Sequence, residues 1–296
     1  MNNRTSRGSL GMFVASMLIF GTIGVFRRYI PLPSAFLAFA RGILGGLFLL
    51  IFVWLKKKGT TEKLPPRTLG KLIFSGAMIG LNWMLLFEAY NHTTVAVATL
   101  CYYMQPTLVM LLSPLLFREK LTGKKALCAC LSLLGMALVS GVFGTSAGGD
   151  GDGLGVLLAL SAAALYAAVI IVNKKTKQGD AYQSTVVQLL SAGGVMGLSL
   201  LKTDGFRELS FQPSTLVLLL VVGILHTGIA YALYFGGMEG LSVQSIAVLS
   251  YIDPASALLF SAVLLGEPLT WMNLAGAVLI IGSALFSEMK GTERNA

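Results

Sequence analysis

The chain has 296 residues, of which 55% are hydrophobic and only 12% are charged. This composition leaves too little polar surface to cover a soluble globule of that size, so most of the chain must face lipid or other apolar helices. The formal net charge is +9, but no basic stripe with interleaved aromatic residues points to a nucleic-acid partner. We therefore expect a polytopic protein of the lipid bilayer and not a soluble enzyme.

Apolar segments long enough to cross a bilayer fill the sequence. The hydrocarbon core is about 30 Å thick and a helix rises about 1.5 Å per residue, so one crossing takes roughly 20 mostly apolar residues. The breaks between segments are short and carry prolines, glycines or charges. In chain order we expect ten transmembrane helices, at 9–27, 33–55, 70–90, 93–116, 124–143, 153–173, 182–201, 214–237, 241–264 and 270–287.

The distribution of lysine and arginine predicts the orientation of these helices. If the N-terminus is inside, the inside segments hold seventeen basic residues and the outside segments hold four, Arg27, Arg28, Lys202 and Arg207. Because basic residues stay on the cytoplasmic side, we expect both termini in the cytoplasm and the protein in the cell (inner) membrane. The positive net charge is then a consequence of topology.

The three cysteines, Cys101, Cys128 and Cys130, all fall within apolar spans. Residues 128 and 130 point to different sides of a helix, which is poor geometry for a metal-binding pair. We interpret all three as small buried hydrophobic side chains and expect neither a metal nor another cofactor.

A shift of 148 positions aligns the two halves of the chain with each other. Eight identities then fall within a window of twenty residues, among them the pairs Pro106 with Pro254 and Glu119 with Glu267. At an offset of 147, Arg41 aligns with Gln188. The eight repeated positions in the first half are Tyr103, Pro106, Leu111, Ser113, Leu116, Glu119, Leu121 and Thr122.

Each half of the chain therefore holds five spans, and we place the two repeats at 1–146 and 153–296. Because five is odd, the second repeat starts on the opposite side of the membrane from the first, so the repeats must be inverted. Inverted repeats around an axis in the membrane plane are common in secondary transporters, where the substrate site lies near the bilayer midplane between the repeats.

The ends of the fourth and ninth spans, LLFREKL at 115–121 and its copy LLGEPL at 264–269, are each followed by a glycine-bearing helix. This pattern resembles the drug/metabolite transporter superfamily, specifically its ten-helix EamA-type members, over the whole chain. The resemblance implies a basket of helices around a central cavity, alternating access and, usually, export of amino acids or related metabolites. Glu119 and Glu267 fall at helix ends, and we interpret them as capping or loop-fixing residues.

Arg41 is the first candidate for a substrate-binding or coupling residue. It lies about eight residues into the second span, and a charge at that depth is costly enough that it should face a cavity or a partner. The alternative is a structural ion pair with Glu88, since both residues approach from the outer half of the membrane. Cavity contact and scaffolding have equal weight on this evidence.

The prolines in the fourth and ninth spans predict irregular backbone at mid-membrane. Pro106 and Pro254 lack an N–H group and free the carbonyl four residues back, that of Tyr102 or Ser250. We expect kinked helices with exposed backbone acceptors, which are tolerated at that depth where they line a cavity or are covered by protein.

Asp253 and Gln105 stand directly before these two prolines. An acid at the middle of a span is a functional candidate by its cost alone. Asp253 is therefore interpreted as a residue that binds a substrate amine or carries a proton, with a buried, hydrogen-bonded structural acid as the alternative. Gln105 is its counterpart in the first repeat.

Four further residues complete the candidate site. His226 lies near mid-membrane in the eighth span and could relay protons, although a neutral histidine bonded to a neighbouring helix is the preferred interpretation. Asn82 and Trp83, with Tyr231 opposite Trp83 in the repeat register, are expected either to line the cavity or to serve in packing.

The function expected from these features is secondary transport of a small polar molecule, with proton coupling as an option and the oligomeric state left open. No GxxxxGK[ST] loop indicates a primary pump within the chain. An intramembrane protease or lipid transferase is the alternative of another class, but Asp253 lacks a second acid and no GxSG element precedes His226. A nucleotide-sugar exchanger would need more cavity cations than Arg41 alone.

Overall fold

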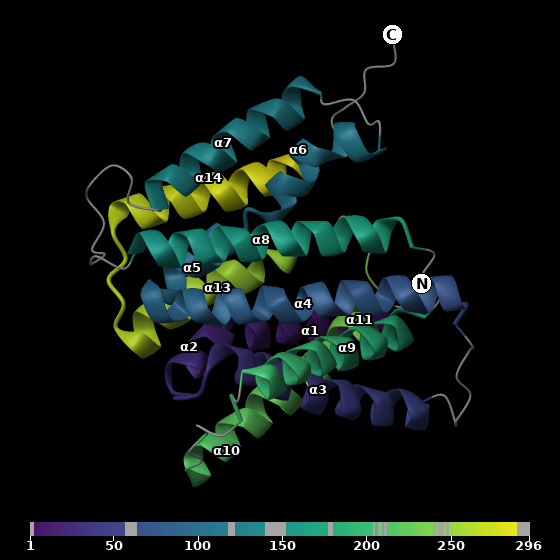
Figure 1. The fold of residues 1–296 in the computed structure, drawn as a ribbon. Coiled ribbons are helices and arrows are strands. Elements are labelled where there is room, and N and C mark those ends of the chain that lie inside the picture. Colours follow the sequence, from purple (N-terminus) through teal and green to yellow (C-terminus); the bar gives the residue numbers. More distant parts are fainter. Residues whose placement is uncertain are drawn as a thin grey trace.

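The computed structural model describes residues 3–56, 64–117, 122–139, 152–176, 180–203, 205–206, 209, 212–238, 241, 246 and 249–288. All regular secondary structure in these residues is helical. Figure 1 shows most of the long helices running roughly side by side in one bundle. Glu119, the start of the predicted ninth span and the end of the predicted fifth span lie outside the described residues.

The first half of the chain forms five spans, of which the first and fourth are broken. The helices are α1 (Asn3–Gly21), α2 (Ile23–Arg28), α3 (Ser34–Lys56), α4 (Pro66–His92), α5 (Val95–Tyr102), α6 (Gln105–Phe117) and α7 (Gly123–Val139).

The second half repeats this order, with a π-helical segment, η1, inside its third span. The helices are α8 (Asp152–Lys174), α9 (Ala181–Lys202), α10 (Pro213–Leu220), η1 (Val221–Ile229), α11 (Ala230–Met238), α13 (Ile252–Leu265) and α14 (Trp271–Glu288).

The ten predicted spans correspond to ten apolar helical elements in the described residues. Seven of them are long and apolar enough to cross a membrane by themselves. The other three are the shorter apolar helices Ala126–Val139, Ile252–Leu265 and Trp271–Ser283. The expected all-α architecture with ten membrane helices is confirmed.

The helix contacts are pseudo-symmetric. When each span is replaced by its counterpart in the other half, the same kind of helix pair results. Three spans pack on their own counterparts, α3 on α9, α5 on α13 and α7 on α14. The remaining pairs are exchanged: α4 packs on α8 and α9, while η1 and α11 pack on α3 and α1. A two-fold rotation between the halves produces this exchange, and with five spans in each half the repeats are inverted.

Close packing between the halves depends on glycines where two helix backbones meet. A Cβ atom added at Gly42 on α3 would lie 2.5 Å from the backbone nitrogen of Gly193 on α9. One added at Gly76 on α4 would lie 2.4 Å from the carbonyl oxygen of Gln188. These glycines therefore allow the close approach of helices from the two halves.

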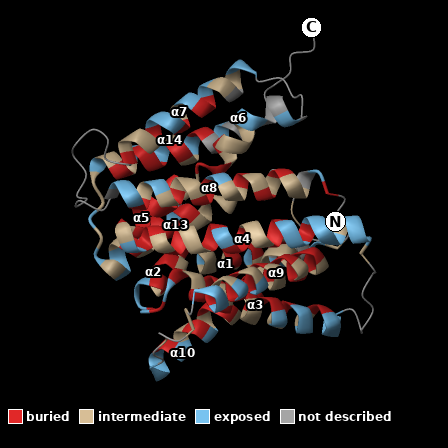
Figure 2. Ribbon diagram, viewed as in Figure 1, coloured by how far each residue is buried: buried red, intermediate tan, exposed pale blue. Residues whose placement is uncertain are grey.

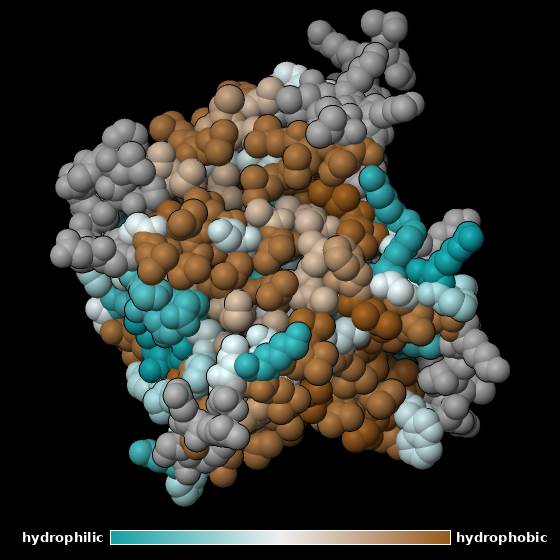
Figure 3. Space-filling view, in the orientation of Figure 1, coloured by the Kyte–Doolittle hydropathy of each residue, from teal (hydrophilic) through white to brown (hydrophobic). Residues whose placement is uncertain are grey.

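The bundle is buried at its centre and apolar on its outer surface. Figure 2 shows the buried residues concentrated where α1, α4, α5 and α13 meet, and Figure 3 shows hydrophobic side chains over much of the visible face. Trp271 is 86% exposed and Val263 is 79% exposed. Large apolar side chains with this exposure are stable in contact with lipid, so the chain is a multi-pass membrane protein.

Candidate functional site

The fourth span is interrupted at Tyr103 and Met104, directly before the candidate residue Gln105. The N–H of Tyr103 donates to the Thr99 carbonyl at 3.0 Å, and the N–H of Met104 donates to the Cys101 carbonyl at 3.1 Å. The second bond spans only three residues and tightens the last turn of α5, and α6 then starts at Gln105.

The break corrects one expectation about the prolines. Pro106 is the second residue of α6 and Pro254 is the third residue of α13, so neither lies inside a continuous helix. In the first turn of a helix the missing N–H leaves no bond unmade. The spans are therefore broken before the prolines instead of being kinked by them.

Asp253 lies in the first turn of α13, which begins at Ile252. The exposed N–H groups of a helix start carry partial positive charge and favour a carboxylate there. The hydroxyl of Tyr103, in the break of the fourth span, donates a short hydrogen bond to Oδ2 of Asp253. This contact joins the two repeats at the point where their equivalent spans are broken.

Gln105 lies in the first turn of α6, the position equivalent to that of Asp253 in α13. Its side chain is buried, and its Oε1 atom has no hydrogen-bond partner among the described residues. Gln105 thus keeps an acceptor in the interior of the bundle. No hydrogen bond joins Gln105 Oε1 to Asp253 in the described residues.

Arg41 is buried in α3, with 6% of its surface exposed. Its guanidinium carbon lies 4.0 Å from the centre of the Trp83 ring on α4, which is cation–π geometry. Its Nε atom donates to Thr227 Oγ1 in η1 at 2.8 Å. The charge is therefore stabilised by an aromatic face and a hydroxyl group.

The alternative prediction from the sequence, an ion pair between Arg41 and Glu88, is wrong. Glu88 accepts a hydrogen bond from Ser34 at 2.6 Å and lies 3.2 Å from both His92 and Asn91, near the end of α4. Glu88 lies one and a half turns beyond Trp83 along α4, and the end-of-helix partners draw its carboxylate away from Arg41. Glu88 thus does not join the central group of candidates.

Arg41 and Asp253 are nevertheless within electrostatic range of each other, without a direct contact among the described residues. Asp253, Tyr102 and Tyr231 all lie close enough to Arg41 to interact with it electrostatically. Asp253 and these tyrosines keep a partly accessible surface although they lie within the bundle. We call the group of Arg41, Trp83, Tyr102, Tyr103, Tyr231 and Asp253 the central site.

Aromatic rings form much of the surroundings of the central site. The Tyr102 ring lies 6.0 Å from both Tyr103 and Tyr166, and the Tyr231 ring stacks on Phe235 at 6.1 Å. Rings in this setting provide apolar contact area and hydroxyl groups at a low cost in side-chain entropy. A small organic molecule would meet both charge and aromatic surface here.

Asn82 is fully buried and serves in helix packing beside this group. Its Nδ2 atom donates to the Ala162 carbonyl on α8 at 2.6 Å. Its Oδ1 atom accepts a weak hydrogen bond from the Tyr102 hydroxyl at 3.4 Å. Asn82 therefore orients Tyr102 and does not itself carry a free polar group.

His226 is fully buried in η1. Its Nε2 atom lies 2.8 Å from Thr22 Oγ1, at the break between α1 and α2, and its ring meets Phe26 edge to face at 4.7 Å. This is the geometry of the structural histidine that the sequence favoured. The π-helical turn that carries His226 also carries Thr227, the partner of Arg41, and such turns often occur at functional sites.

Sequence reasoning missed Tyr103 in the central site and two residues that contact the site, Tyr166 and Thr227. Tyr103 had a usable signal, because it is one of the repeated positions and aligns with Tyr251. Thr227 had none, because only the packing of η1 against α3 brings it to Arg41. The described residues contain no cluster of His, Cys, Asp and Glu with the geometry of a metal site.

The described residues form ten apolar helices in two inverted halves, with Arg41 on the continuous helix α3 and Asp253 at the break of the ninth span. These are the features of a membrane transporter of the inverted-repeat class. Two matches to the EamA-like transporter family cover residues 7–141 and 153–289. The chain belongs to this family.

Two relatives that match this chain over most of their length are named as uncharacterized transporters. It is 32% identical to the uncharacterized transporter YxxF of Bacillus subtilis, over 92% of this chain and 87% of that one. It is 26% identical to the uncharacterized inner membrane transporter YicL of Salmonella typhimurium, over 98% of each chain. A crystal structure with 22% sequence identity aligns with a TM-score of 0.65 over 95% of this chain and 96% of the other, and shows the same fold.

Proposed function

We propose that the protein is a secondary transporter that exports amino acids or related small zwitterionic metabolites by alternating access. The observation that carries the substrate class is the pair of opposite charges in the central site, Arg41 from the first repeat and Asp253 from the second. A zwitterion presents a carboxylate to Arg41 and an ammonium to Asp253. Each charge-assisted hydrogen bond of this kind contributes about 1.5–3 kcal/mol.

The broken spans support the same assignment. Asp253 and Gln105 occupy the first turns of α13 and α6, which are discontinuous helices equivalent in the two repeats. Discontinuous helices of this kind supply helix ends and unpaired backbone groups to substrates and coupling ions near the midplane of other transporters. The unpartnered Oε1 atom of Gln105 is a further acceptor for an ammonium group.

Asp253 is also the proposed carrier of a coupling proton. A carboxylate with a tyrosine hydroxyl donor and a neighbouring arginine can exchange a proton for a substrate ammonium. The proposal further places the protein in the inner membrane with both termini in the cytoplasm and sets the repeats at 1–146 and 153–296. The name of the relative YicL supports the location, and the basic-residue count supports the orientation.

The test is an untargeted comparison of the metabolites that cells export with and without the protein. A zwitterionic metabolite should accumulate outside only in cells that hold the intact central site, and Arg41→Gln should abolish the difference. The matched control is Arg27→Gln, because Arg27 is equally buried but bonds to Ile30 and Ser34 at the end of the bundle. Export of anionic or cationic metabolites alone would refute the zwitterion assignment.

A further inference from the structure

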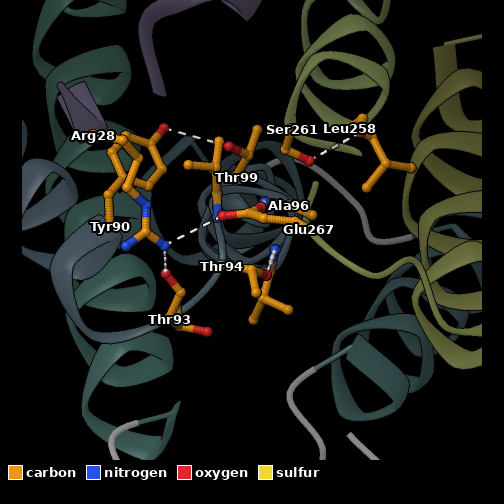
Figure 4. A network of polar contacts seen from close by, with 11 residues as sticks. Arg28, Tyr90, Thr93, Thr94, Ala96, Thr99, Leu258, Ser261 and Glu267 are labelled. Carbon is orange, nitrogen blue, oxygen red and sulfur yellow. Dashed lines mark hydrogen bonds and ion pairs between the residues drawn. The ribbon is translucent and has the colours of Figure 1, made fainter. Parts of the chain in front are cut away.

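One end of the bundle is closed by a carboxylate from the second repeat that binds segments of the first repeat. Figure 4 shows Glu267, in the connection from α13 to α14, beside the start of α5 and the end of α2. We give the name Glu267 clip to Glu267, its partners Arg28, Val95 and Ala96, and Thr93, which accepts a hydrogen bond from Arg28. The end of the protein where it lies is called the clip end.

Glu267 completes the N-terminal cap of a helix from the other repeat. Its Oε1 atom accepts the N–H of Val95 at 3.0 Å, and its Oε2 atom accepts the N–H of Ala96 at 3.3 Å. The side chain of the helix's own cap residue, Thr94, accepts the N–H of Val97 at 3.1 Å. Two of the free N–H groups at the start of α5 are thus satisfied from the second repeat, with favourable charge at a helix N-terminus.

Arg28 ties a third segment to this cap. Its Nη2 atom lies 3.2 Å from Glu267 Oε1 and donates to the Thr93 carbonyl at 2.7 Å. The Glu267 side chain is only 10% exposed, so solvent screens this pair less than an ordinary surface pair. A pocket of about 340 Å³ lies beside Arg28 at the clip end, and Asn91 also lines it.

The backbone after α13 directs Glu267 into this position. Gly266 has φ +67°, the left-handed conformation that ends a helix and that glycine adopts without strain. The N–H of Glu267 then donates to the Ser261 carbonyl at 3.3 Å. The turn fixes the carboxylate against α5 instead of leaving it in solvent.

The clip and the central site lie along the same helix interface. α5 packs on α13, and the contact between Tyr103 and Asp253 joins this pair of spans deeper in the bundle. Thr99 lies on α5 between the clip and Tyr103, one turn from Val95, and is 5% exposed. A substrate path to the central site along this interface would pass the clip.

We propose that the Glu267 clip is the gate that closes the central site at the clip end. Alternating access moves one repeat or bundle against the other around a fixed site, and the clip is an ion pair with a helix cap that spans both repeats. The hydrogen bond between His92 and Glu88 at the same end differs, because both residues belong to α4. The inference rests on the alternating-access part of the proposed function and not on the substrate.

The experiment measures how fast a buried cysteine becomes accessible at this interface. The three native cysteines are replaced, Thr99→Cys serves as the reporter, and the full-length protein in lipid nanodiscs reacts with a polar maleimide. Arg28→Gln and Glu267→Gln should each raise the labelling rate about tenfold or more, the effect of a 1.4 kcal/mol shift toward the open state. His92→Gln, which changes the His92–Glu88 contact within α4, should leave the rate within about twofold.

The two variants separate a gate from a simple helix cap. Arg28→Gln removes the ion pair but leaves Glu267 able to cap α5, so faster labelling in this variant supports the gate. An unchanged rate in Arg28→Gln overturns the proposal, whether or not Glu267→Gln labels faster through fraying of α5. Thermal melting of each variant confirms that the protein is folded. The labelling needs no substrate, so a failure here is distinct from a failure of the amino-acid assignment.

Discussion

The arginine of the central site is stabilised in a way that leaves it available to an anion. Arg41 lies on the Trp83 ring and bonds through Nε to Thr227, with no carboxylate in direct contact among the described residues. A planar guanidinium suits this arrangement because one face can stack while the Nη edge stays free for a bidentate carboxylate. Lysine could not replace it, since an ammonium has no such fork.

We predict that Arg41→Gln and Asp253→Asn each weaken substrate binding by about tenfold to over a hundredfold. Each change removes one charge-assisted bond of about 1.5–3 kcal/mol, and 1.4 kcal/mol is a factor of ten. Binding of the exported metabolite to purified protein measures the effect. Normal transport by both variants at normal insertion levels would leave the two residues as scaffold.

The role of Asp253 in energy coupling gives a separate prediction. Asparagine cannot release or take up a proton, so Asp253→Asn should abolish the response of transport to a pH gradient. If Asp253 carries the coupling proton, exchange of substrate across vesicles should continue in this variant. Loss of exchange and of the pH response together would assign Asp253 to substrate binding alone.

Equivalent helices of the two repeats use equivalent polar contacts with different side chains. Arg41 on α3 donates to Thr227 on η1 at 2.8 Å. Its counterpart by alignment, Gln188 on α9, donates to Ser75 on α4 at 2.9 Å. Both contacts cross between the repeats, and only the one made by Arg41 carries a charge. The inverted fold therefore has equivalent polar contacts that are charged asymmetrically.

The packing of α3 on α9 gives a prediction about stability. Gly42→Ala should lower the melting temperature of the purified protein, because the added Cβ would meet the α9 backbone at 2.5–2.8 Å and overpacking costs about 1–3 kcal/mol. Gly194→Ala is the control, since a Cβ at Gly194 on α9 has no heavy atom within 4 Å. A Gly42→Ala protein that melts at or above the parent temperature would contradict the close-contact interpretation.

At the scale of the whole molecule, the pseudo-symmetric packing means that each end of the bundle is built by both repeats. The clip end unites α2 and α5 of the first repeat with the connection from α13 to α14 of the second. An inverted arrangement makes the two ends equivalent in principle, and differences in side chains between the repeats then decide which end opens more easily.

The orientation of this bundle gives the last prediction. We expect both termini in the cytoplasm, because the basic residues concentrate on that side. A reporter that is active only outside the cytoplasm should be silent when fused after Ala296 and active when fused after Thr203, in a connection expected outside. The reverse pattern would invert the topology and place the clip end on the cytoplasmic side.

The sequence alone determined the architecture of this protein. Apolar segments of about 20 residues can only be helices in lipid, because every backbone polar group must be satisfied within the segment. The self-alignment and the odd number of spans then required inverted repeats, and burial costs singled out Arg41 and Asp253 as charges that need partners. These inferences depend on composition and spacing, which a linear chain displays.

Only the tertiary structure decided which residues meet. Glu88 forms hydrogen bonds with Ser34 and His92. Arg41 instead lies on the Trp83 ring and donates a hydrogen bond to Thr227. Tyr103 finds Asp253, and Glu267 caps a helix of the other repeat. These contacts join residues as far as 186 positions apart in the chain. Rotation of helices about their axes and breaks within spans set such contacts, and neither is fixed by hydropathy, which reports only whether a segment lies in lipid.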